Sequence, residues 1–478
     1  MAAIAISPLA GCAAPNLGRR PSPITSAQVE QPAMPVENAV WPADRWWEAF
    51  GDPQLSTLIT EGLDRAPDLA AASARLRAAD AVAREAGAAF LPTLAGQGSA
   101  GVVKQSYNAG IPRQFVPKGW NETGNANLQA GFDIDPWGRN RATARAALSE
   151  AEASAIELAQ ARLVLATGIA DAYAELIRLS AERAIAIDVI KVRSDTEQLV
   201  SDRVSNGLDT QAELKQATGA VPAAKAELGA TDEAIALVKN QLAALTGQGP
   251  GRGEAIVDPI ARGGRYGLPT GIRTDLLARR PDVRAAMARV EAAAARIKAA
   301  RTAFYPSLNL TGLIGLQALG FGNIFKAGST YGNVAPAITL PIFDGGVLRA
   351  RYRGSRANYD AAVADYDGAV IQAFRQVADV AVSRTALTGR LQNAQAALLA
   401  SQQAYEIARL RYRGGLSTYL DVLAAQTAVL QNRRIAADLT TRAFSLDVAL
   451  VRALGGGFEP TAPFHRLMPL PFKDDIRG

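Results

Sequence analysis

The sequence predicts a mainly α-helical, internally duplicated protein that also contains a small amount of membrane-type β structure. Three observations predict this fold class. Alanine accounts for 97 of the 478 residues, a composition that favours long and closely packed helices. The second half of the chain repeats the pattern of the first. Four segments, two in each half, alternate apolar and polar residues in the manner of strands.

The duplication sets the expected organisation of the chain. Residues 67–92 align without a gap on 281–306, and from Gly138, which matches Gly346, the alignment continues for over a hundred residues. The expected divisions are a signal peptide truncated at its start (1–11), a lipid anchor and extended segment (12–40), a first repeat (41–247), a linker (248–270), a second repeat (271–457) and a C-terminal tail (458–478).

Each repeat is expected to contain a helix, two strands and two further helices. Residues 139–205 and 347–413 have apolar positions at helical spacing and no proline, which predicts two helices of about 100 Å each. Return helices of about 38 residues are expected after Gly207 and Gly415, with Pro222 interrupting and kinking the first. Helices this long must pack along one another, because they cannot cover a compact globule.

The strands are expected to form a membrane sheet. In 307–318 the even-numbered positions are mostly apolar and the odd-numbered ones mostly polar or small, and the other strands share this phase. One face therefore suits lipid and the other suits water. Between Thr302 and Phe343 the only charged residue is Lys326. The four predicted strands are 93–103, 123–135, 307–318 and 333–342.

Such a sheet requires an oligomer. An open sheet in hydrocarbon would leave edge N–H and C=O groups without hydrogen bonds, at a cost of several kcal/mol each. Two chains would supply eight strands, which enclose little more than side chains, whereas three chains would supply twelve and leave a lumen. We therefore expect a homotrimer in which a 12-stranded β-barrel is continued by an α-helical barrel.

Composition argues against catalysis. The chain has one His (His465) and one Cys (Cys12), whereas His/Cys metal sites need three or four such ligands and nucleophilic triads need a base beside the nucleophile. We expect no catalytic residue, no metal site and no cofactor. The net charge of +6 comes without a basic run interleaved with aromatics, so no nucleic-acid partner is expected. Asp133 and Asp135 could imitate a catalytic carboxylate pair, but lining of the lumen or the barrel base is favoured.

The N-terminus resembles a bacterial lipoprotein signal. The box Leu9-Ala10-Gly11-Cys12 ends an apolar stretch, and a polar, Pro-rich segment follows it. The resemblance implies cleavage before Cys12, acylation of its thiol and, because Ala13 follows, sorting to the outer membrane. No Lys or Arg precedes Cys12, so we expect the true start to lie upstream. A buried structural cysteine is the alternative.

Taken together, the motifs resemble the outer membrane efflux protein family (TolC-like), and within it the NodT-type lipoproteins. The resemblance covers the chain from about Trp41 to Gly456. It rests on the segments Trp46–Leu55, Phe132–Gly138, Arg279–Val283, Phe304–Leu308 and Arg411–Leu423. It implies a passive trimeric duct, lipid-anchored in the outer membrane and crossing the periplasm, that exports small molecules such as drugs. The implied partners are a periplasmic adaptor protein, an inner-membrane pump of the resistance-nodulation-division type and outer membrane lipid.

The resemblance also assigns roles at the turns that join the long helices. These turns are expected at the periplasmic mouth, where three copies of Asp421 would form a carboxylate ring. Alternatively, Glu213 and Asp421 only cap helix starts, as Thr210-x-x-Glu213 and Thr418-x-x-Asp421 indicate. The gate residues implied are Tyr412, Asp421, Glu213 and Asp209. The implied adaptor contacts are Gly207, Leu208, Gly415, Leu416 and Ser417.

Two other functions would be compatible with part of the sequence. An exit duct for type I protein secretion would use the same fold, but the Trp46–Leu55 segment and the lipoprotein box count against it. A coiled-coil scaffold without a pore would have no lipid-facing strands, so the alternating segments count against it. Trp41, Trp46 and Trp47 could suggest an aromatic ligand cage, although packing of the N-terminal segment against the outside of the tube is favoured.

Overall fold

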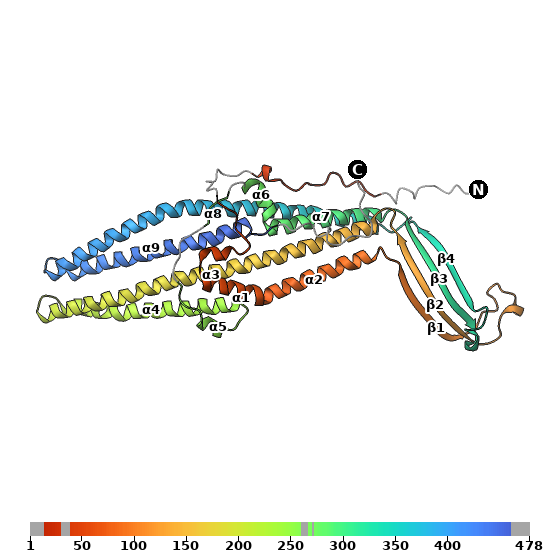
Figure 1. The fold of residues 1–478 in the computed structure, drawn as a ribbon, viewed down its shortest axis with the longest axis horizontal. Coiled ribbons are helices and arrows are strands. Elements are labelled where there is room, and N and C mark those ends of the chain that lie inside the picture. The colour runs from red at the N-terminus through yellow and green to blue at the C-terminus, as the bar shows by residue number, and fades with distance from the viewer. Residues whose placement is uncertain (1–13, 30–38, 260–265, 270–271, 460–478) are drawn as a thin grey trace.

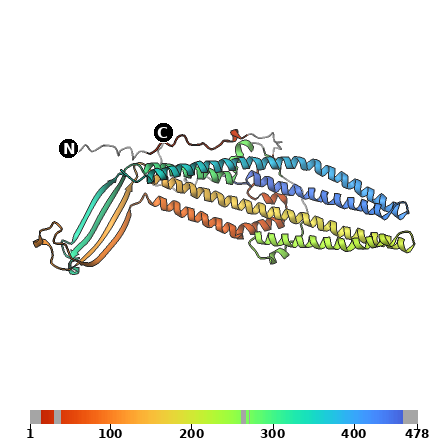
Figure 2. The same ribbon diagram turned by 180° about the vertical axis from the view of Figure 1, so that it is seen from behind.

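The protein is elongated, with a four-stranded sheet at one end and long helices at the other (Figures 1 and 2). The computed structural model describes residues 14–29, 39–259, 266–269 and 272–459. The first repeat contains α1 (Pro53–Arg65), α2 (Pro67–Ala88), β1 (Thr93–Val103), β2 (Asn121–Ile134), α3 (Arg139–Ser205) and α4 (Gln211–Leu245), and α5 (Gly251–Glu254) lies in the linker. The second contains α6 (Ile272–Arg279), α7 (Pro281–Thr302), β3 (Ser307–Leu319), β4 (Thr330–Thr339), α8 (Val347–Arg413) and α9 (Tyr419–Leu454).

The two long helices, α3 and α8, have the bounds that the sequence predicts. Each begins after a glycine in the left-handed conformation, Gly138 at φ 78° and Gly346 at φ 94°. The return helices α4 and α9 contain 35 and 36 residues, slightly fewer than expected. The predicted interruption at Pro222 is wrong, because α4 runs through it as one helix, and the predicted kink there stays a prediction. Val221 and Ala224 beside it are buried, and this packing offsets the hydrogen bond that proline cannot make.

The strands form one antiparallel sheet in the order β1-β2-β3-β4. The prediction for β4 was three residues late: the strand ends at Thr339, ahead of Pro341, which has no N–H to donate to a ladder. The register aligns the even-numbered positions of all four strands. One row, for example, runs Gly96, Leu128, Ile314, Gly332.

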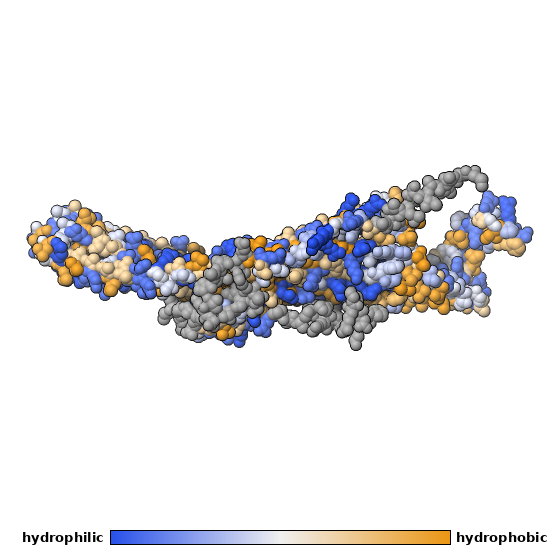
Figure 3. All heavy atoms as spheres, turned by 90° about the horizontal axis from the view of Figure 1, so that it is seen from above, coloured by the Kyte–Doolittle hydropathy of each residue, from blue (hydrophilic) through white to orange (hydrophobic). Residues whose placement is uncertain are grey.

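This register separates an apolar face from a polar face. The exposed large side chains Leu94, Leu128, Ile314 and Val334 all have even numbers and share the first face. The odd-numbered face carries amides and a phenol that bond to one another, such as Asn125 Nδ2 to the Tyr331 hydroxyl at 2.7 Å. Viewed from the β4 side, apolar residues gather where the sheet adjoins the helices (Figure 3). The expected alternation is confirmed.

Two buried clusters hold the helices together. The first joins Trp46, Trp47 and Phe50 to α1, α3 and α9, and the second joins α6, α7, α8 and the end of α9. Trp46 and Trp47 therefore pack in a core rather than forming a ligand cage. Among the described residues, α3 alone is long and apolar enough to cross a membrane. This helix packs against α1, α2, α4, α7 and α9.

The N-terminal segment from Ala14 to Val29 runs along α8 away from the sheet and ends beside α6 (Figure 1). The N–H of Ile24 donates to Asp367 at 2.9 Å, and the Tyr359 hydroxyl donates to the carbonyl of Pro21 at 3.1 Å. The earlier residue of the segment, Pro21, contacts the earlier residue of α8, Tyr359. Because α8 begins beside the sheet, the segment approaches the sheet toward its N-terminal end.

Candidate functional site

Two turns of the same design form the tip of the helices, one in each repeat. Gly207 has a φ of 72°, and the N–H of Leu208 donates to the carbonyl of Arg203 at 2.9 Å. Gly415, at φ 73°, has the same place in the second turn. There the N–H of Leu416 donates to the carbonyl of Arg411 at 2.8 Å. A helix end of this kind needs a left-handed residue, and glycine adopts that conformation without strain.

The helices that leave these turns begin with capping boxes. The N–H of Thr210 donates to Glu213 at 2.7 Å, and the N–H of Glu213 donates back to the Thr210 hydroxyl at 3.4 Å. Thr418 and Asp421 repeat this pattern at 2.9 and 3.4 Å. The backbone N–H and hydroxyl of Thr418 lower the pKa of Asp421. Both acids therefore cap helix starts, as the sequence indicated.

A contact between the two turns joins the repeats at the tip. The guanidinium of Arg203 donates to both carboxylate oxygens of Asp209, at 2.9 and 3.1 Å. It also donates to the backbone carbonyl of Tyr412 at 2.8 Å. The Tyr412 hydroxyl donates in turn to Asp209. We call this arrangement of Arg203, Asp209 and Tyr412 the tip contact.

The tip contact is buried, and its acid and base are paired with each other. Tyr412 is fully buried, and the side chains of Arg203 and Asp209 are 13% and 7% exposed. The Arg203 guanidinium lies 4.5 Å from the centre of the Tyr412 ring, a cation–π distance. Burial raises the pKa of Asp209, but the bonds from Arg203 and Tyr412 outweigh it and leave that pKa below 3.8. Burial and the bond to Asp209 raise the pKa of Tyr412.

The tip contact is asymmetric between the repeats. In the duplication Asp209 matches Ser417, and Tyr412 matches Val204, so the second repeat cannot reproduce the contact on its own side. Among the predicted gate residues, the structure brings Asp209 and Tyr412 together, whereas Glu213 and Asp421 remain in their caps. Sequence reasoning missed Arg203. Its spacing of six residues before Asp209, across a glycine turn, was the available signal.

The other predicted residues are placed as follows. Leu208 and Leu416, named as adaptor contacts, are 63% and 72% exposed at the tip. Gly207 and Gly415 are exposed beside them, and Ser417 donates weakly to the carbonyl of Ala408. Cys12, the predicted lipidation site, lies outside the described residues. Asp133 and Asp135 bind the start of α3, through Arg139 and Arg141 respectively.

Comparisons with known proteins agree with this architecture. The family model described as outer membrane efflux protein matches residues 58–248 and 272–456. The fusaric acid resistance protein FusA of Burkholderia cepacia is 32% identical over 75% of this chain and 69% of that protein. The pyoverdine export outer membrane protein OpmQ of Pseudomonas putida is 32% identical, over 88% of this chain and 90% of that protein.

A solved structure shows the same fold. The outer membrane protein VceC of Vibrio cholerae is 43% identical and superposes with a TM-score of 0.83, covering 88% of this chain and all of that one. The chain therefore belongs to the outer membrane efflux protein family and is the outer membrane channel of an efflux system, with a membrane sheet and helices that extend into the periplasm.

Proposed function

We propose that three copies of the chain form a passive duct that exports small molecules from the periplasm to the outside. The main support for this proposal is the sheet. Its outer strands β1 and β4 each pair with only one neighbour, and only one of its faces is apolar. Pairing β1 of one copy with β4 of the next would satisfy both edges and close a barrel of twelve strands. The amide-rich odd-numbered face would then line its lumen.

The tip contact is proposed as the gate of this duct. It holds the turn after α3 against the end of α8, so opening would require Arg203, Asp209 and Tyr412 to separate. Asp421 would add three carboxylates at the same mouth. The exposed leucines Leu208 and Leu416 offer apolar contacts to a periplasmic adaptor protein, which would connect the duct to an inner-membrane pump and bias the tip toward opening.

Acylated Cys12 is proposed to anchor the protein in the outer membrane. The N-terminal segment supports this, because its contacts along α8 lead toward the sheet end of the molecule. Each buried acyl methylene contributes about 0.8 kcal/mol to membrane binding. The cargo is proposed to be small organic molecules, as the names of the fusaric acid resistance and pyoverdine export relatives indicate.

Conductance in planar bilayers tests the proposed duct. Purified trimers carrying Asp209→Asn should conduct more than wild type, because the substitution removes the carboxylate that Arg203 and Tyr412 share. Asp360→Asn is the matched control, since Asp360 is an exposed carboxylate bonded to Arg356 at 2.9 Å far from the tip. Correctly folded Asp209→Asn trimers that never conduct would contradict the proposed function.

A further inference from the structure

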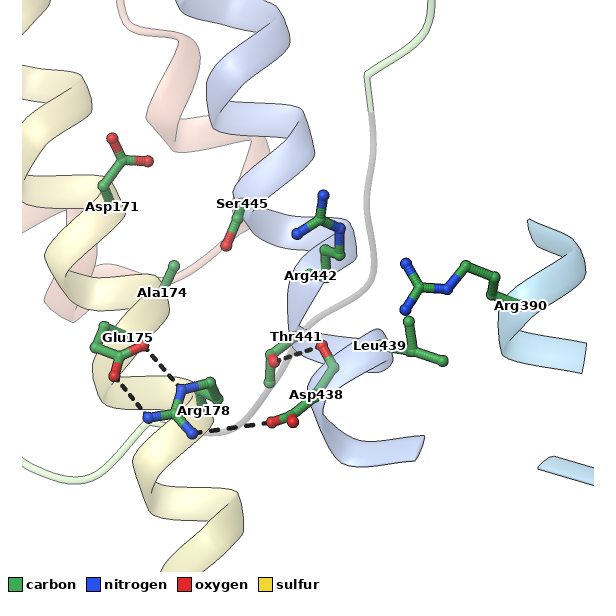
Figure 4. Close-up of a pocket in the computed structure, with 10 residues that line it drawn as sticks. All are labelled: Asp171, Ala174, Glu175, Arg178, Arg390, Asp438, Leu439, Thr441, Arg442 and Ser445. Atoms are coloured by element: carbon green, nitrogen blue, oxygen red, sulfur yellow. Dashed lines mark hydrogen bonds and ion pairs between the residues drawn. The ribbon is translucent and has the colours of Figure 1, made fainter. Parts of the chain in front are cut away.

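A polar pocket lies near the middle of α3, between α3, α8 and α9 (Figure 4). Its volume is about 330 Å³, within the range of pockets that hold small molecules. Six charged side chains and four smaller or apolar ones line it. They are Asp171, Glu175, Arg178, Arg390, Asp438 and Arg442, with Ala174, Leu439, Thr441 and Ser445.

The acidic side chains of this pocket already have cationic partners. Arg178 binds Glu175 at 2.7 Å and lies 3.9 Å from Asp438. Asp171 binds Arg452, outside the pocket, at 2.6 Å. Arg178 also binds Glu182 at 3.0 Å, so one guanidinium is shared by three carboxylates, and each acid of the pocket has an arginine within 4 Å.

The cations from α8 and α9 have no such direct contacts. Arg390 and Arg442 have neither a hydrogen bond nor an ion pair within the part of the chain that the structure describes, and both are exposed. Arg390 extends from α8 toward α9, where Arg442 lies (Figure 4). A guanidinium cannot lose its proton in a protein, so two positive charges without a direct ion-pair partner face this end of the pocket.

The pocket opens away from the buried core. On α3, Ile169 and Leu176 are fully buried in the cluster with Trp46. Asp171 comes two residues after Ile169, and Arg178 comes two residues after Leu176. Two residues turn a helix by about 200°. The N-terminal elements therefore cover the side of α3 that carries Ile169 and Leu176, and the charged side chains of the pocket lie on the other side, with Ala174 at the boundary. In a trimeric tube with those elements outside, the pocket side faces the lumen.

We propose that Arg390 and Arg442 form an anion-binding station in the lumen, which receives the carboxylate of a small organic acid during export. This inference rests on the proposed duct and names one class of its cargo. Guanidinium groups match carboxylates in shape and charge, and Ala174 and Leu439 would contact the hydrocarbon part of the same molecule. Three protomers place six guanidinium groups around the lumen, an arrangement that favours anions in a pore.

Ion selectivity tests the station within a conducting duct. Reversal potentials under a KCl gradient are measured in a Tyr412→Phe background, with and without Arg390→Gln plus Arg442→Gln. The chloride-to-potassium permeability ratio should fall about fivefold, the effect of losing one ~4 Å charge contact in water. Arg162→Gln is the matched control, because this exposed arginine precedes Asp171 by nine residues, which places it on the opposite face of α3. It should leave the ratio unchanged.

Binding in detergent tests the station without requiring conduction. Calorimetric titration of wild-type trimers should show tighter binding of benzoate than of its neutral analogue benzamide, and the double arginine variant should lose that preference. Benzoate preference without conduction would support the station and contradict the duct. Conduction with unaltered selectivity and no benzoate preference would overturn the station alone. Dissociation of the variant trimers, with wild type showing no benzoate preference, would also overturn it, because the arginines would then bind a neighbouring protomer.

Discussion

Replacing Tyr412 with Phe removes one hydroxyl group from the tip contact and keeps the aromatic ring. The ring is fully buried and lies 4.5 Å from the Arg203 guanidinium, so its packing and cation–π contact persist in the variant. The Arg203–Asp209 ion pair also remains. The substitution therefore tests the single hydrogen bond from Tyr412 to Asp209.

The expected effect follows from the charge of the acceptor. A hydrogen bond to an ionised group contributes about 1.5–3 kcal/mol, and Asp209 keeps two bonds from Arg203, so we expect the lower value. Each 1.4 kcal/mol changes an equilibrium about tenfold. If three protomers open together, the open-to-closed ratio of the trimer should rise by about a thousandfold.

Single-channel recording in planar bilayers measures this ratio as open probability. Tyr359→Phe is the matched control: its hydroxyl donates to Pro21 at 3.1 Å, far from the tip. The melting temperature of Tyr412→Phe should stay close to that of wild type, because the core is unchanged. Equal open probabilities for folded wild-type and Tyr412→Phe trimers would refute the gating role, as would equal opening by Tyr359→Phe.

The same contact predicts the pH dependence of opening. The pKa of Asp209 lies below its ordinary 3.8, so its contribution to the closed tip is complete above that value and is lost as pH falls through the lowered pKa. The pKa of Tyr412 lies above its ordinary 10.0, so its contribution is complete below 10.0 and is lost as pH rises through the raised pKa. Open probability should stay constant between about pH 5 and 9. A large change within that window would contradict the assignment.

Three further predictions concern the sheet, the core and the anchor. Ile314→Lys on the apolar face should cost about 2–4 kcal/mol and reduce the fraction of folded trimer in vesicles, whereas Asn333→Lys on the other face should not; equal losses would reject the assignment of faces. Gly455→Ala should lower the free energy of unfolding, and with it the denaturant midpoint, by about 1–3 kcal/mol for the left-handed backbone alone, and the contact of the new Cβ with the Arg279 carbonyl adds to this cost. Gly322→Ala, with open space around it, should not lower the midpoint, and an equal fall would exclude this cause. Cys12→Ser should remove the mass of the acyl groups from the mature protein by mass spectrometry, and an unchanged mass would exclude lipidation there.

Much of the fold could be predicted because its signals are local. Each long helix has the bounds expected from apolar spacing between glycines, and the shared phase of the strands predicted which face each residue occupies. The errors were also local. The predicted end of β4 ran past Thr339, where Pro341 cannot join a ladder, and Pro222 was expected to interrupt a helix that tertiary packing holds together.

The candidate site was predicted only in part, because its partners are distant in sequence. The capping roles of Glu213 and Asp421 follow from a three-residue spacing, and the structure shows them directly. The role of Arg203 was not predicted, because one of its acceptors, the carbonyl of Tyr412, belongs to the other repeat. No periodicity within one helix indicates which residue of another helix lies beside it.

The sequence by itself determined the elements, the duplication and the two faces of the sheet, since backbone geometry and burial impose periods of 3.6 and 2 on the residues of each element. Only the tertiary structure decided how the two repeats meet. It placed Arg203 and Asp209 of one repeat against Tyr412 of the other, and it placed Arg390 and Arg442 at a pocket whose acids contact other arginines. The physical reason is that a side chain's environment at a helix–helix contact depends on the rotation and offset of both helices, which the repeated sequence pattern leaves open.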